Sequence, residues 1–125
     1  MSAIVQLDRL TKRYNGSLAV GGIELAIEER EIFGLVGPNG AGKTTTLKML
    51  ATLLEPNAGD AQICGHSVRR QADEVRRVIG YMPDTFGVYD DMRVWEYLDF
   101  FGRCFGLPAA RRRQGINDLL ELVDL

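Results

Sequence analysis

A glycine-rich segment with one lysine carries the clearest chemistry in the sequence. Residues 37–44 read GPNGAGKT, which fits the pattern G-x-x-x-x-G-K-[ST] at every fixed position. Glycines let a backbone loop fold tightly and turn several N–H groups toward its centre. Lys43 offers a mobile ammonium to the β- and γ-phosphates, and the Thr44 hydroxyl can ligate Mg²⁺. The segment therefore predicts a loop that binds a nucleoside triphosphate; the alternative is a glycine turn with a chance lysine.

The elements on either side of this loop are of the kind that phosphate binding requires. Residues 32–36 form a short, continuous apolar run, which predicts a strand buried on both faces of a parallel sheet. After the loop, Leu47, Leu50 and Leu54 recur at helical spacing until Pro56, which ends the predicted helix. The N-terminus of that helix would direct its partial positive charge toward a bound phosphate. Motif and context thus agree.

The remaining segments alternate between predicted strands and helices, which indicates an α/β fold. Alternating residues predict a strand over residues 4–8, and residues 14–17, with Asn-Gly at their centre, predict a turn. A second strand is expected over residues 18–28, with Gly21-Gly22 at a bulge or bend. Further strands are predicted over residues 61–64 and 78–82, and helices over residues 68–77, 94–105 and from Pro108 onward.

Composition narrows the classes of protein to consider. The 125 residues suit one domain, and 46% hydrophobic with 26% charged residues argues against disorder and coiled coil. A net charge of -2 does not favour a broad basic face for nucleic acid. No run approaches the ~18 apolar residues of a membrane helix, so we expect any link to a membrane to come through a partner. Two cysteines and one histidine, His66, do not make a zinc site.

The wider wording GPNGAGKTTT, at residues 37–46, resembles the ATP-binding subunit of ABC transporters. The resemblance spans nearly the whole chain. Within the family, the sequence is similar in wording to the export-type branch. The segments that carry it elsewhere are residues 10–14, 53–59, 79–83 and 94–98. The resemblance implies a P-loop NTPase core with a mixed sheet and an antiparallel β subdomain. We expect residues 1–92 to form part of that core and residues 93–125 to begin the helical subdomain, in which the domain is truncated.

The resemblance also implies roles for individual residues. Tyr14 matches the aromatic residue that stacks on adenine; the alternative is a strand-end tyrosine with a solvated hydroxyl. Asp84 stands where the family usually has a glutamine near Mg²⁺ and the attacking water, and it is the one candidate catalytic residue. Its alternative is an aspartate in a turn before Gly87. Phe86 and Tyr89 are candidates for docking a transmembrane partner, or pack within their loop.

The resemblance implies one site for the nucleotide and its metal ion. The implied nucleotide-binding set is Tyr14, Gly37, Pro38, Asn39, Gly40, Ala41, Gly42, Lys43, Thr44 and Thr45, and the implied Mg²⁺ ligands are Thr44 and Asp84.

The function that the resemblance implies is the binding of MgATP to power export through a separate membrane subunit. The implied partners are a transmembrane permease subunit and a second ATP-binding subunit, at the inner, cytoplasmic face of the membrane. The sequence holds no LSGGQ-like signature, Walker B motif or later switch histidine, so we expect very slow hydrolysis by this chain alone. The alternative is a truncated nucleotide-binding or regulatory module without turnover. A GTPase fits less well, because residues 84–87 match D-x-x-G but no Asn-Lys-x-Asp base reader follows.

Overall fold

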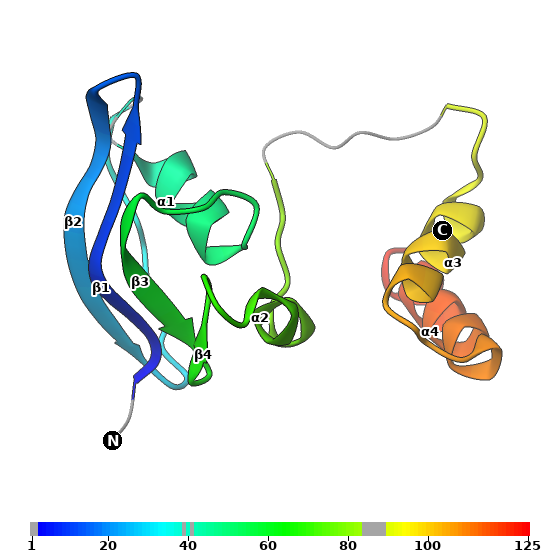
Figure 1. The fold of residues 1–125 in the computed structure, drawn as a ribbon. Helices are drawn as coiled ribbons and strands as arrows, with labels where there is room; N and C mark the ends of the chain where they lie inside the picture. Colours follow the sequence, from blue (N-terminus) through cyan, green and yellow to red (C-terminus); the bar gives the residue numbers. More distant parts are fainter. Residues whose placement is uncertain (1–2, 39, 41, 84–89) are drawn as a thin grey trace. The chain divides into compact units, whose positions relative to one another are not determined.

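The chain forms two compact units, Met1–Met82 and Pro83–Leu125, in a computed structural model that describes residues 3–38, 40, 42–83 and 90–125. Within the described residues, the first unit holds a four-stranded sheet with two short helices, and the second holds a pair of helices (Figure 1). No helix in this described part of the chain is both long and apolar enough to cross a membrane.

The sheet of the first unit is antiparallel throughout, in the order β2-β1-β3-β4. Its strands are β1 (Ala3–Tyr14), β2 (Ser17–Glu28), β3 (Ala58–Ile63) and β4 (His66–Ser67). The turn predicted at residues 14–17 joins β1 to β2, with Tyr14 paired to Ser17. Asn15 and Gly16 have φ of 47° and 80°, the positive values that a two-residue hairpin turn demands and that Asn-Gly adopts most easily.

A bulge makes β1 longer than the sequence pattern predicts. Simple alternation stops after Asp8, yet the strand continues to Tyr14. The pairing with β2 shifts between Leu7 and Leu10, and Arg9 between them has a φ of 50°. The extra residue turns both leucines into the core although they are three positions apart. The bulge therefore lets one strand run from the core to Tyr14.

Two helices close one face of this sheet. They are α1 (Lys43–Leu50) and α2 (Ala72–Val78), and Figure 1 shows α1 lying against the sheet. Met49 of α1 and Val75 of α2 are fully buried in one cluster with apolar side chains of the strands. Full burial of a side chain such as Met49 contributes about 1.5–3 kcal/mol, so this cluster fixes α1 on the sheet.

Two predicted strands are wrong. Residues 31–38 have no regular structure, and Ile32 and Val36 are 102% and 93% exposed instead of buried. Residues 78–82 also contain no strand, because α2 runs to Val78 and residues 79–82 are irregular. A buried parallel strand needs neighbours on both sides. The strands of the described chain all pair within the antiparallel sheet and leave these two segments unpaired.

The helices of the first unit are shorter than predicted. Helix α1 ends at Leu50 rather than near Leu54, and α2 begins at Ala72 rather than Val68. The late start of α2 has a local cause. The Ser67 hydroxyl accepts the N–H groups of Arg69 and Arg70, at 3.2 and 3.1 Å, and so holds the chain in a turn before the helix.

The second unit is the helix pair that the sequence predicts. Helix α3 (Val94–Cys104) and helix α4 (Ala109–Leu122) are joined by a short turn, and Pro108 stands immediately before α4, where its missing N–H costs nothing. Within this unit a cavity between the helices is lined by Trp95, Asp99, Arg103, Ala109, Arg112, Arg113, Ile116, Asn117 and Leu120.

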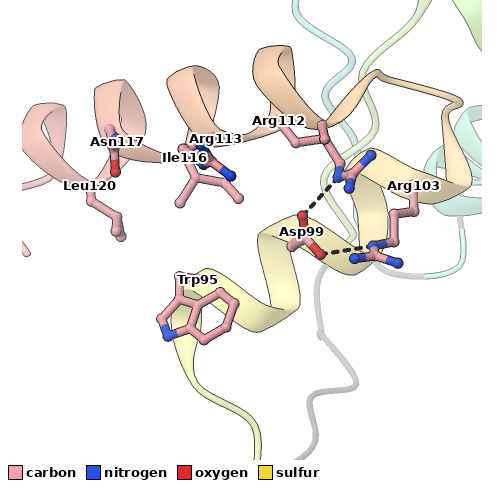
Figure 2. Close-up of a pocket in the computed structure, with 9 residues that line it drawn as sticks. Trp95, Asp99, Arg103, Arg112, Arg113, Ile116, Asn117 and Leu120 are labelled. Atoms are coloured by element: carbon pink, nitrogen blue, oxygen red, sulfur yellow. Dashed lines mark hydrogen bonds and ion pairs between the residues drawn. The ribbon is translucent and has the colours of Figure 1, made fainter.

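Asp99 joins the two helices (Figure 2). It accepts hydrogen bonds from Arg112 of α4 at 2.7 Å and from Arg103 of its own helix at 2.9 Å. Arg112 also donates to the Leu107 carbonyl at 2.7 Å, so it ties α4 to the preceding turn. The hydrogen bond from Arg112, followed by that from Arg103, lowers the pKa of the Asp99 carboxyl below its ordinary 3.8.

Replacing Gly59 by alanine tests the close approach of β3 to the bulge in β1. Gly59 has a φ of +73°, and a Cβ there would overlap the Arg9 carbonyl and lie 2.6 Å from the Asp8 carbonyl. We expect Gly59→Ala to lower the free energy of unfolding by about 3 kcal/mol or more. Gly65→Ala is the matched control, because Gly65 has a φ of +81° but open space around it, and should cost only about 1 kcal/mol. Equal losses in thermal unfolding would contradict the packing argument.

Acidification should loosen the contact between α3 and α4. Because the pKa of Asp99 is lowered by folding, its stabilisation is complete above pH 3.8 and is lost as the pH falls through the lowered pKa. Trp95, the chain's one tryptophan, lines the same cavity and reports on it by fluorescence. We expect its emission to change only below pH 3.8, and this change to be missing in Asp99→Asn.

The control for this titration is Asp118→Asn, because Asp118 accepts from Gln114 at 2.9 Å and does not join the two helices. This variant should keep the acid transition of the wild type. An unchanged transition in Asp99→Asn would show that other carboxyl groups cause it.

Candidate functional site

Three separate segments of the first unit line one pocket. Its walls come from the end of β1, the start of β2, and the glycine loop with the first turn of α1. The lining residues are Tyr14, Ala19, Gly40, Gly42, Lys43, Thr44 and Thr45. The volume is about 300 Å³, at the lower end of the range for small-molecule sites. The structure thus brings Tyr14 to the same pocket as four residues of the predicted phosphate loop and Thr45 directly after it.

Gly42 sets how closely the loop approaches β2. It has a φ of 90° and stands directly before α1. A Cβ at this position would lie 2.6 Å from the Ala19 carbonyl oxygen and 3.2 Å from Val20. Both the backbone angle and the space therefore require glycine. This contact holds the first turn of α1 beside the strand that pairs with β1.

The first turn of α1 presents hydrogen-bond donors to the pocket. The Gly42 carbonyl accepts the N–H of Thr46 at 2.9 Å and the Thr46 hydroxyl at 2.8 Å. The N–H groups of Lys43, Thr44 and Thr45 precede the first helical hydrogen bond, so the helix supplies them with no acceptor. These donors and the helix dipole favour an anion at this end.

Lys43 folds back over its own loop. Lys43 is half-buried, and its ammonium donates a hydrogen bond to the Gly37 carbonyl. The acceptor is neutral, so the positive charge is not compensated by this bond. A phosphate in the pocket would offer the same ammonium a charged acceptor, which makes a stronger hydrogen bond.

Of the three threonines after Lys43, two line the pocket and the third is buried in the helix. Thr44 is exposed and Thr45 half-buried, and both line the pocket, so Thr44 is placed where its hydroxyl can meet a metal ion beside a phosphate. Thr46 is buried and bonds within the helix. The motif predicted Thr44 and the family resemblance implied Thr45, but neither pointed to Ala19, which lies in β2.

Some expected site residues lie elsewhere or outside the described chain. Gly37 contributes the carbonyl that Lys43 contacts, and Pro38 is exposed. The predicted positions that fall outside the described residues are Asn39, Ala41, Asp84, Phe86 and Tyr89.

Comparison with known proteins identifies relatives with these features. The ABC transporter family matches residues 20–125. The Nod factor export ATP-binding protein I of Ralstonia nicotianae is 42% identical over 122 residues, which cover 98% of this chain and 38% of that protein. Its counterpart in Cupriavidus metallidurans is 38% identical over 125 residues, 100% of this chain and 41% of that protein. The chain thus spans about two-fifths of the length of these curated relatives.

Solved structures agree with the sequence relatives. An ATP-binding subunit of an ABC transporter has a TM-score of 0.80 at 27% identity, over 94% of this chain and 49% of that chain. The dimeric ATP-binding cassette MJ0796, in a post-hydrolysis state with ADP and Pi, has a TM-score of 0.78 at 26% identity, over 97% of this chain and 57% of that chain. These matches confirm the predicted fold class. The chain belongs to the ABC transporter family, in which it aligns with the ATP-binding subunits.

Proposed function

We propose that the pocket formed by Tyr14 and the first turn of α1 binds MgATP, and that the chain serves as the ATP-binding component of an ABC-type exporter. Membership of the ABC transporter family implies nucleotide binding. The proposal that the ligand is MgATP rests on one observation. An aromatic ring and a loop whose N–H and ammonium groups can donate hydrogen bonds to phosphate line the same pocket.

The loop residues of the pocket would hold the triphosphate. The free N–H groups of the first turn of α1 and the dipole of that helix supply donors and partial positive charge. Lys43 would exchange the Gly37 carbonyl for phosphate oxygens and keep its full charge. Gly40, with a φ of 86°, lets the loop backbone approach the ligand without a side chain between them.

Tyr14 would hold the base. Tyr14 is 46% exposed at the end of β1 and lines the pocket, so part of the residue is supported by protein and part is open to a ligand. An aromatic ring stacks on any base with little discrimination, so we expect GTP to compete with ATP.

The Thr44 hydroxyl would be one ligand of Mg²⁺, and Asp84 is the second proposed ligand, at the position where the family usually has glutamine. Bound Mg²⁺ neutralises charge that builds up on the transferred phosphoryl group. The oxygen donors proposed here are of the kind that Mg²⁺ prefers.

We also propose a membrane-associated assembly for this chain. Its partners would be a transmembrane permease subunit and a second ATP-binding subunit, which would place it at the cytoplasmic face of the membrane. The export named for the curated relatives and the dimeric state of MJ0796 support this. Residues 1–92 would belong to the nucleotide-binding core and residues 93–125 to the start of the helical subdomain.

Replacing Lys43 tests the phosphate site. We expect Lys43→Ala to weaken ATP binding roughly 10- to 100-fold, because hydrogen bonds to charged groups contribute about 1.5–3 kcal/mol. Lys48→Ala is the matched control, since Lys48 is an exposed lysine in the last turn of the same helix. Calorimetric titration with MgATP measures both affinities.

Two results would bear on the proposal directly. If Lys43→Ala bound ATP as tightly as Lys48→Ala, the glycine loop would not be the phosphate site. Release of phosphate from bound ATP separates a transport ATPase from a module that binds nucleotide without turnover.

A further inference from the structure

We propose that Lys12 is a positioning residue for Tyr14: its ammonium occupies one face of the Tyr14 ring, so that a base stacks on the other. This inference rests on the proposed function, because it concerns the same pocket, and it adds a residue to which neither the motif nor the family likeness gives a role.

Lys12 lies over the ring that it would position. Its Nζ is 5.4 Å from the centre of the Tyr14 ring, within the ~6 Å over which a cation and an aromatic face attract each other. Lys12 and Tyr14 are two positions apart near the end of β1, where the pairing with β2 shifts register between Lys12 and Arg13. The attraction therefore acts between residues that lie close together in one strand.

A second contact holds the lysine in this place. The Lys12 ammonium donates a hydrogen bond to the Glu55 carbonyl at 2.8 Å. Lys12 is half-buried, so the long side chain has little freedom to leave the ring. Its acceptor is a neutral carbonyl, which leaves the charge of the ammonium available to the π electrons of Tyr14.

The segment that holds Lys12 is itself fastened to β1. The Asn57 N–H donates to the Thr11 carbonyl at 2.9 Å, and the Asn57 side chain accepts the N–H of Arg13 at 2.6 Å. This segment follows α1, whose first turn forms the phosphate end of the pocket. The same helix thus connects the loop that would hold phosphates to the residues that hold the ring.

The arrangement leaves one face of the ring for a ligand. Tyr14 lines the pocket, whereas Lys12 is not among the lining residues. A ring fixed before binding loses less conformational freedom when a base stacks on it, so the lysine should raise affinity for the base and not for the phosphates.

The test compares ATP with inorganic tripolyphosphate, which carries the phosphates without a base. Lys12→Met removes the charge and keeps an unbranched side chain. We expect it to weaken ATP binding roughly 2- to 10-fold and to leave tripolyphosphate binding within about twofold. Lys12→Arg should restore ATP affinity, because a guanidinium also makes cation–π contacts. Arg13→Met, which removes a neighbouring exposed cation that does not line the pocket, should leave both affinities unchanged.

A double-mutant comparison separates positioning from direct contact. If Lys12 acts through the ring, Lys12→Met should cause no further loss in a Tyr14→Ala background. The ring-proton resonances of Tyr14 without nucleotide should shift in Lys12→Met and not in Arg13→Met. This readout does not depend on binding.

The outcomes distinguish the two proposals. Three results for Lys12→Met would overturn the role of Lys12 and leave the proposed function standing. The variant could lose ATP and tripolyphosphate affinity equally, lose ATP affinity equally with Tyr14 and with Tyr14→Ala, or bind ATP as the wild type does. A wild-type chain that binds neither ATP nor tripolyphosphate would overturn both.

Discussion

The absence of a side chain at Gly42 is the constraint on which the pocket depends. The loop before α1 can approach the Ala19 carbonyl of β2 only because no Cβ stands between them, and the left-handed backbone angle there also requires glycine. This close approach sets the first turn of α1 beside the β1–β2 hairpin. The hairpin carries Tyr14 at its end, so a backbone contact decides that an aromatic ring and a set of helical N–H donors share one pocket.

Helix α1 serves the core and the pocket at once. Lys43 and Thr44 face the pocket in its first turn, Met49 is fully buried in the core, and the segment beyond the helix returns to β1 through Asn57. Any movement of the first turn would therefore disturb packed apolar side chains and hydrogen bonds at the other end. Because packed interiors resist such displacement, the pocket gains rigidity from the core rather than from the glycine loop itself.

Patterns of residue types within a few positions predicted turns, loops and helices of this fold. They did not predict features that depend on pairing or packing with residues far away in the sequence. The glycine loop, the Asn-Gly turn and the helices of the second unit follow from residue types within a few positions. The bulge at Arg9 hid the second half of β1, because an extra residue breaks the alternation that marks a strand. Residues 32–36 have the composition of a buried strand, but hydrophobicity does not supply the neighbouring strands that such burial needs. Ala19 lines the pocket because β2 pairs with β1, which residue types near Ala19 do not indicate.

The cavity of the helix pair and the pocket beside Tyr14 differ in whether the positive charges near them are compensated. The hydrogen-bond acceptors of the basic side chains explain this difference. In the helix pair, Arg103 and Arg112 both bond to the carboxylate of Asp99, so their charges are partly neutralised, and the bond from Arg112 holds the two helices together. In the first unit, Lys43 and Lys12 bond to backbone carbonyls, which satisfy the ammonium groups without neutralising them. An anionic oxygen would add the attraction of opposite charges that a neutral carbonyl does not supply, so an anionic ligand can displace the Gly37 carbonyl from Lys43. Under the proposed function, the uncompensated charge of Lys43 would meet a phosphate, while that of Lys12 would act on the ring of Tyr14.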